Sequence, residues 1–226
     1  MAFDSATTGC SVAVWRGGQV LAHDAREVGR GQAEVLLPMA ADALRTAGLA
    51  PQDLDGVAVT RGPGGFTGMR IGLAAARGFA LALGVPCIGV TTLEAVARGT
   101  RMDEREGHTI LAAIESKRED VYVQLFDQDL KALSAPLAAA GPALAELVRA
   151  HPTPSVVGDA ALRARDMLNQ EGLDSAISTA PAMPDTRLVA DIAAARFHPV
   201  PTAPPEPLYL RPPDAKRPKN QGRARP

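Results

Sequence analysis

Short apolar runs alternate with longer amphipathic stretches through the first hundred residues. The short runs predict strands over 1–4, 11–15, 19–23, 57–60 and 86–90. Apolar residues spaced three and four apart predict helices over 32–47, 66–83 and 92–98. The first of these helices contains Pro38, and an interior proline costs about 3 kcal/mol, so we expect its regular part to begin at Leu37.

The order of these elements predicts the fold class. Three antiparallel strands come first, and helices and parallel strands then alternate. This order gives a mixed sheet with helices on both faces. The sequence therefore predicts an α/β protein.

The second half of the chain begins after a charged stretch over 101–106, where the pattern starts again. Strands are predicted over 109–115, 121–127 and 155–157, and helices over 141–150, 159–170 and 186–197. This half resembles an eroded repeat of the first, without a period at the level of residues. We expect an N-terminal lobe over 1–100, a smaller α/β lobe over 101–214, and a basic, proline-rich, disordered tail over 215–226.

The composition narrows the class of protein and its location. The 226 residues are 46% hydrophobic and 22% charged, which is enough apolar material for one large or two small domains. The net charge of −1 gives no overall attraction to nucleic acid, so a contact with RNA has to be local or made by a partner. Two cysteines and the lack of a signal-peptide or membrane-spanning apolar run predict a cytoplasmic protein.

A glycine-rich segment from Thr60 to Arg70 is the strongest local motif. It lies between a predicted strand and a predicted helix, where backbone N–H groups can hold an anion, with Gly64, Gly65 and Thr67 as candidates. The segment lacks the Gly-Lys-Ser/Thr of a Walker loop and the third glycine of a dinucleotide loop. The alternative is a tight turn whose glycines let the helix and the strand approach closely.

Asp4 ends the first predicted strand and is the other candidate for ligand binding. Its position resembles the first phosphate-binding turn of the actin-like ATPases, where the carboxylate would face a metal-bound phosphate. The alternative is a strand-end aspartate that accepts hydrogen bonds from backbone amides in the turn.

Other chemistry finds little support in the residues. The histidines at positions 23, 108, 151 and 198 have no metal-ligand spacing, and Cys10 and Cys87 form no Cys-x-x-Cys pair. A Gly-x-Ser-x-Gly nucleophile motif is absent as well. We therefore expect no metal, no cofactor and no catalytic residue.

Two of the predicted helices carry more apolar surface than one sheet requires. The helix over 66–83 has a stripe of small residues, and the helix over 32–47 has two apolar stripes. A helix covers a sheet with a single apolar face, so the excess predicts contact with another subunit. The predicted interface residues are Leu36, Met39, Ala40, Ala43, Gly68, Met69, Gly72, Leu73, Ala76 and Phe79. The alternative is a thick core within one chain.

A succession of motifs resembles the bacterial TsaB (YeaZ) family and covers nearly the whole chain. It runs through Phe3-Asp-Ser-Ala-Thr-Thr8, Leu36-Leu-Pro-Met39, Arg61-Gly-Pro-Gly-Gly-Phe-Thr-Gly-Met-Arg-Ile-Gly72, Ile88-Gly-Val-Thr-Thr-Leu93, Leu111-Ala-Ala-Ile-Glu115 with Val121-Tyr122, and Tyr209-Leu-Arg211. The central glycine-rich block is the most specific of them. The sequence departs from the family's pattern at Gln32, at Gly65 and over 115–117, and its short first strand leads us to expect a truncated start.

The resemblance implies a two-lobed actin-like (ASKHA, ribonuclease H-like) fold and a place in the complex that makes threonylcarbamoyladenosine in tRNA. In that family the subunit is non-catalytic and dimerises with the catalytic paralogue TsaD through N-lobe helices. A TsaE-like ATPase is a further partner, tRNA is reached through the complex, and the subunit forms a homodimer when alone.

Two alternatives to the scaffold remain. One is a small actin-like ATP-binding protein that uses Asp4 and the Gly62–Gly68 loop. The other is a self-standing peptidase, for which the sequence offers no nucleophile.

Overall fold

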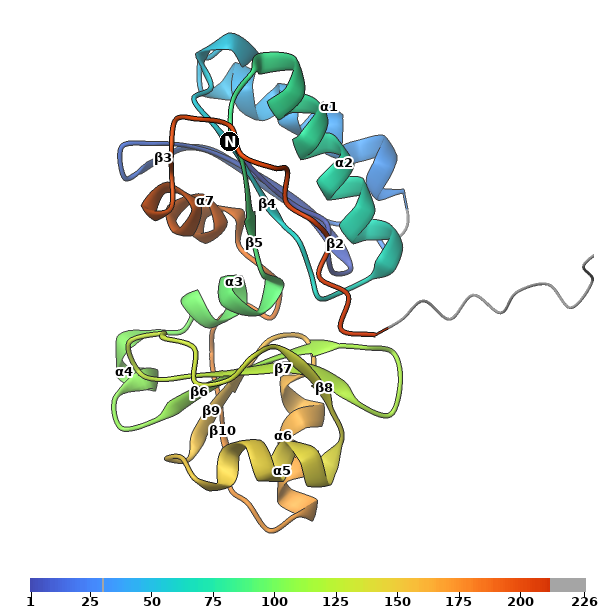
Figure 1. Ribbon diagram of the computed structural model, residues 1–226, viewed down its shortest axis with the longest axis vertical. Helices are drawn as coiled ribbons and strands as arrows, with labels where there is room; N and C mark the ends of the chain where they lie inside the picture. Colours follow the sequence, from blue (N-terminus) through green and yellow to red (C-terminus); the bar gives the residue numbers. More distant parts are fainter. Residues whose placement is uncertain (30, 212–226) are drawn as a thin grey trace, which may run out of the picture.

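The computed structural model describes residues 1–29 and 31–211. In this part of the chain two five-stranded sheets, each with helices beside it, form two lobes stacked along the long axis of the molecule (Figure 1).

The first sheet follows the predicted order of strands. It contains β1 (Ala2–Asp4), β2 (Gly9–Arg16), β3 (Gln19–Glu27), β4 (Val57–Thr60) and β5 (Cys87–Val90), arranged β3-β2-β1-β4-β5. β1 to β3 are antiparallel, whereas β1, β4 and β5 are parallel. The predicted mixed sheet is therefore confirmed.

Helices α1 (Gln32–Thr46) and α2 (Phe66–Leu83) cover one face of this sheet (Figure 1). The expectation that α1 becomes regular only at Leu37 is wrong, because Pro38 lies inside a helix that begins at Gln32. Pro38 is on the exposed side of α1, where water can reach the carbonyl that lost its N–H partner.

The other face of the first sheet is covered by α7 (Thr186–Ala195), which comes from the far end of the chain. Successive residues of a strand point to opposite faces, so Val59 faces α1 and α2 while Ala58 faces α7. Ala58 and Val90 share a buried cluster with Val189 of α7. The expectation that 101–214 forms the second lobe is therefore wrong for α7, because this helix completes the core of the first lobe.

The second sheet repeats the topology of the first. It contains β6 (Thr109–Glu115), β7 (Val121–Phe126), β8 (Leu137–Ala139), β9 (Pro154–Val157) and β10 (Ala176–Ile177), arranged β10-β9-β6-β7-β8. Here too the first three strands are antiparallel, and β6, β9 and β10 are parallel. The eroded repeat expected from the sequence is thus present at the level of topology.

Helices from both halves of the chain cover the second sheet. α5 (Gly141–Arg149) and α6 (Ala161–Gln170) pack on one face. α3 (Thr92–Arg98) packs on the other, with Leu93 and Val96 against Ile110 and Ile114. The boundary expected at residue 100 is therefore misplaced by one helix, since α3 belongs to the core of the second lobe and lies between the two sheets (Figure 1).

Two shorter helices and a C-terminal segment complete the described chain. They are η1 (Pro51–Asp53), α4 (Met102–Arg105) and residues 199–211, which run back over the first lobe (Figure 1). The predicted tail over 215–226 lies outside the described residues. Among the described helices, none combines the length and the apolar character that crossing a bilayer requires.

Candidate functional site

The carboxyl ends of β1 and β4 bring the two predicted ligand-binding segments together. These strands pair in parallel, with Phe3 opposite Val59, so Asp4 and Thr60 end at the same edge of the sheet. Asp4 is only 2% exposed and accepts hydrogen bonds from Thr60 Oγ1 at 2.5 Å and from the backbone N of Ala6 at 3.2 Å.

The Asp4 carboxyl is an internal acceptor. Burial raises its pKa to about 6, against the lowering effect of the hydrogen bonds from Thr60 and Ala6. Both donors belong to the strand ends and the turn themselves. This arrangement matches the turn-stabilising alternative that the sequence left open for Asp4.

The glycine-rich loop lies against the turn that follows β1. The backbone N of Gly65 donates a hydrogen bond to the carbonyl oxygen of Ala6 at 2.7 Å. A Cβ atom at Gly64 would lie 2.2 Å from the same oxygen, so only glycine fits there. Thr67 is exposed at the start of α2. The predicted candidates are thus neighbours, but backbone contacts fill the space between the two segments.

The small-residue stripe of α2 faces the interior of its own lobe. A Cβ at Gly68 would lie 2.1 Å from the carbonyl oxygen of Ser5, and one at Gly72 would lie 2.7 Å from Ser5 Oγ. Ser5 Oγ in turn donates a hydrogen bond to the Gly68 carbonyl at 2.8 Å. The stripe therefore lets α2 approach β1, which is the packing role that glycine in a helix interior can repay.

The predicted interface residues are core residues of this chain, with one exception. Nine of them are buried: Leu36, Met39, Ala40, Ala43, Gly68, Met69, Gly72, Leu73 and Ala76. The tenth, Phe79, is half-buried and packs against Phe3 with ring centroids 5.5 Å apart. The prediction that the nine buried residues contact a partner is wrong, because β1, β2 and β4 already cover them.

The opposite side of α2 is exposed and lacks charge over its last three turns. Ala74, Gly78 and Ala82 lie four residues apart on this side, and Leu81 beside them is 86% exposed. A Cβ at Gly78 would meet nothing within 4 Å. Sequence reasoning missed this face because the stripe at Gly68 and Gly72 drew attention to the other one.

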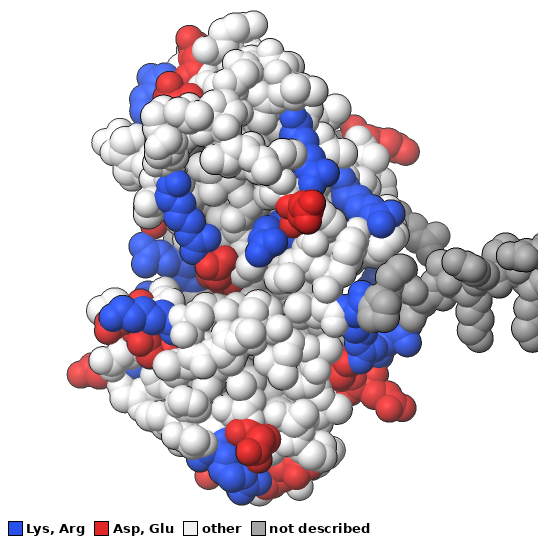
Figure 2. All heavy atoms as spheres, viewed as in Figure 1, with Lys and Arg blue, Asp and Glu red and all other residues white. Residues whose placement is uncertain are grey.

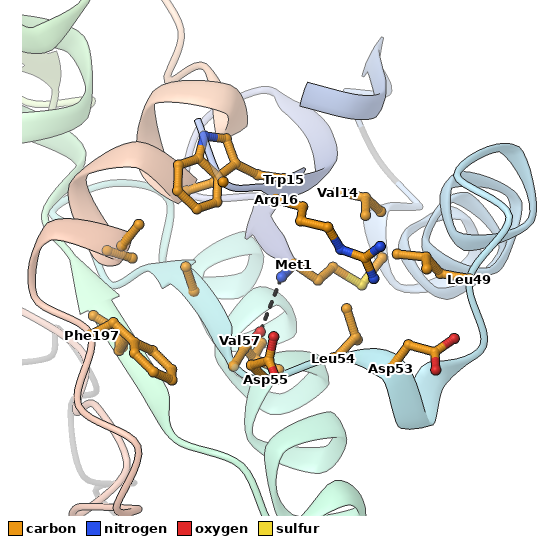
Figure 3. Close-up of a pocket in the computed structure, with 17 residues that line it drawn as sticks. Met1, Val14, Trp15, Arg16, Leu49, Asp53, Leu54, Asp55, Val57 and Phe197 are labelled. Carbon is orange, nitrogen blue, oxygen red and sulfur yellow. Dashed lines mark hydrogen bonds between the residues drawn. The ribbon is translucent and has the colours of Figure 1, made fainter. Parts of the chain in front are cut away.

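A cavity of about 290 Å³ lies at the other end of the first sheet (Figure 3). Trp15 and Phe197 line one side of it, and the loop with Asp53 and Leu54 lines another. The Met1 amino group donates to the Gly56 carbonyl at 3.0 Å, and burial lowers its pKa to about 6. None of the sequence-predicted site residues contributes to this cavity.

The remaining reactive side chains are dispersed. Within residues 1–29 and 31–211 no three His, Cys, Asp or Glu side chains gather as a possible metal site. Cys10 and Cys87 are both buried as free thiols, and burial raises the pKa of each to about 11.

Two lobes with the same five-stranded topology, each with helices on both faces, define an actin-like fold. A family model described as TsaD, tRNA N6-adenosine threonylcarbamoyltransferase, matches residues 25–195. The chain belongs to this family, and within it to the TsaB (YeaZ) proteins.

Individual relatives agree with this assignment. The chain is 42% identical over 130 residues to the tRNA threonylcarbamoyladenosine biosynthesis protein TsaB of Escherichia coli K12, a stretch that covers 57% of this chain and 55% of that protein. It is 33% identical over 187 residues to an uncharacterized protein of Mycobacterium tuberculosis, covering 83% of this chain and 78% of the other. With the E. coli and Haemophilus influenzae TsaB proteins, the matched region spans about half of the relative's length.

Solved structures extend the likeness to the whole fold. A crystal structure of a Pseudomonas aeruginosa protein with similarity to peptidase YeaZ superposes with a TM-score of 0.76 at 28% identity. The superposition covers 93% of this chain and 98% of the other.

Proposed function

We propose that this protein is a non-catalytic subunit of the machinery that transfers a threonylcarbamoyl group to the adenosine beside the anticodon of tRNA. In this proposal it dimerises with a TsaD-like catalytic paralogue through the outward side of α1 and α2, forms a homodimer through the same side when alone, and works with a TsaE-like ATPase. Membership in the TsaB family supports the pathway, since the E. coli relative carries the name of a threonylcarbamoyladenosine biosynthesis protein.

The exposed side of α2 is the observation that carries the docking surface. An interior glycine costs a helix about 1 kcal/mol relative to alanine, and Gly78 has no contact in its own chain that would repay this cost. Ala74, Gly78 and Ala82 allow another helix to approach closely, and Leu81 and Leu37 offer apolar side chains at 86% and 50% exposure. We infer that the helix of a partner lies here.

The contacts of Asp4 support a role without catalysis. Its carboxylate is occupied by Thr60 and Ala6, and the glycine-rich loop is closed against Ala6. The same contacts weigh against the alternative of an ATP-binding protein that uses Asp4 and the Gly62–Gly68 loop. Titration of the isolated chain with ATP tests that alternative, which requires micromolar binding.

The docking surface is tested by mixing the purified chain with the TsaD-like paralogue of the same organism. Leu81→Glu and Gly78→Leu are expected to weaken the complex at least about tenfold, because a charge or a branched side chain then lies between two closely packed helices. The measurement is isothermal titration calorimetry, with light scattering for the mass of the complex.

Leu162→Glu is the matched control, because Leu162 is also an exposed leucine on a helix but lies on α6 of the second lobe. It should leave the affinity unchanged, and all variants should keep the melting temperature of the parent. The proposal fails if the wild-type chain forms no complex, if Leu162→Glu is as damaging as Leu81→Glu, or if the isolated chain carries out the transfer.

A further inference from the structure

The C-terminal strap, defined here as residues 199–211, is held against α2 and the glycine-rich loop. The backbone N of Leu208 donates to the Arg61 carbonyl at 2.7 Å, and the guanidinium of Arg77 donates to the Pro205 carbonyl at 2.5 Å. Gly89 of β5 leaves room for the strap, since a Cβ there would lie 2.6 Å from Pro205 Cβ. The strap is therefore a fixed part of this surface.

Two exposed aromatic rings and an arginine form a stack where the strap meets the first turn of α2. The rings of Phe66 and Tyr209 lie 5.6 Å apart at an interplanar angle of 30°, and Arg70 Cζ lies 3.7 Å from the centroid of Phe66. Arg70 Nε donates to the Tyr209 hydroxyl at 2.8 Å. Phe66 is 47% and Tyr209 41% exposed, so the stack presents flat surfaces to solvent although its members are held in place.

The arginines around this stack keep their charge uncompensated. Arg61, Arg70 and Arg77 donate to carbonyl or hydroxyl oxygens, and within the described residues none of the three forms an ion pair with a carboxylate. Glu206 is the one acid of the strap. Lys and Arg side chains gather over α2 and the strap on the face shown in Figure 2. The sequence after Asp214 adds five more Lys or Arg and no acid.

We propose that this arginine-aromatic surface, made of Phe66, Arg70, Tyr209, Arg61 and Arg77, binds RNA directly. Unpaired bases stack on exposed aromatic rings and on guanidinium planes, and cations beside them hold the phosphates. The two Nη groups of Arg70 have no partner in the described part of the chain and can reach a phosphate beside a stacked base. The proposal rests on the proposed function only for the choice of RNA as the polyanion.

This surface differs from the docking side of α2 in its chemistry. Ala74, Gly78 and Leu81 present apolar or small side chains, whereas the first turn of α2 presents an aromatic ring and a charge. The net charge of the chain is close to zero, so any attraction for RNA has to come from a local patch of this kind. RNA and the catalytic paralogue can then be held side by side on one helix.

The test uses the full chain and a fluorescein-labelled anticodon stem-loop RNA in an anisotropy titration at several potassium chloride concentrations. The wild type is expected to bind in the micromolar range. Phe66→Ala and Tyr209→Ala should each weaken binding about fivefold or more through lost stacking, while Tyr209→Phe, which keeps the ring, should bind nearly as the wild type does. Arg70→Gln should reduce the salt slope by about 1.

Arg149→Gln is the charge-matched control, because Arg149 is exposed on α5 of the second lobe. The proposal is overturned if the wild type does not bind the RNA, if Arg149→Gln loses as much affinity as Arg70→Gln, or if duplex DNA of the same length binds equally well. It is also overturned if Phe66→Ala and Arg70→Gln abolish the complex with the paralogue but leave RNA binding unchanged, which assigns the stack to the protein interface.

The two proposals can fail separately. RNA binding is measured on the isolated chain, whereas docking is measured with the paralogue. Loss of RNA binding with an intact complex removes only the RNA surface, and an RNA-binding chain that ignores the paralogue removes only the docking surface.

Discussion

At the scale of single residues, Asp4 shows what a motif can and cannot predict. The sequence places an acid at a strand end and beside a glycine-rich loop, and the structure confirms that the two segments meet. Whether the carboxylate faces solvent depends on Thr60 and Ala6, whose distances to it are set by the pairing of β1 with β4. Such distances are tertiary, so the sequence alone could only leave both roles open.

Burial of Asp4 makes the stability of the protein depend on pH. The pKa of Asp4 is about 6 in the folded chain and near its model value of 3.8 in the unfolded chain, so the folded state binds more protons between these values. Its contribution to the free energy of unfolding therefore decreases as pH rises from about 4 to about 6, by roughly 2–3 kcal/mol.

Asp4→Asn removes this titration and keeps an oxygen that accepts from Thr60. Urea unfolding from pH 4 to pH 7 is expected to give a smaller decrease in stability for the variant than for the wild type. Because other groups titrate equally in both proteins, the difference between the two curves isolates Asp4. Parallel curves contradict this account.

At the scale of elements, α2 was predicted with its correct bounds, but its buried side was not. Both sides of this helix consist of small or apolar residues, with Gly68, Gly72 and Ala76 on one and Ala74 and Gly78 on the other. Periodicity identifies a helix from its apolar spacing and cannot rank two similar faces. The short strands β8 and β10 were missed for another reason, since two or three residues carry too little pattern to recognise.

The two glycines Gly68 and Gly78 of α2 give a matched pair of substitutions. Gly68→Ala places a Cβ 2.1 Å from the Ser5 carbonyl oxygen, so the backbone has to shift, and we expect a loss of about 1–3 kcal/mol. Gly78→Ala meets nothing within 4 Å and should stabilise the chain by up to about 1 kcal/mol through helix propensity.

Thermal unfolding of both variants measures the difference directly. Gly72→Leu, which the sequence suggested as a mild interface substitution, is instead expected to damage the fold, because its Cβ alone would lie 2.7 Å from Ser5 Oγ. Equal melting temperatures for Gly68→Ala and Gly78→Ala would show that α2 is not packed against β1 as described.

At the scale of the whole molecule, the two lobes exchange helices. The sequence pattern predicted the second round of strands correctly, yet it placed the boundary by a charged stretch at 101–106. Charge marks an exposed segment but does not say which sheet the flanking helices cover. α3 crosses to the second sheet and α7 returns to the first, so each lobe depends on a segment from the other half of the chain.

Fragments that differ only by these helices test this exchange. Leu93 and Val96 of α3 are almost fully buried against the second sheet, and burying each such side chain stabilises by about 1.5–3 kcal/mol. Their sum approaches the total stability of a small domain, so a fragment over 92–184 should unfold cooperatively in urea and one over 101–184 should not. A fragment over 1–100 should also lack a cooperative transition, because without α7 the face of Ala58 and Val90 is open to water. If 1–100 and 101–184 both fold as cooperative units, the helices only decorate the lobes, and the two halves are independent domains after all.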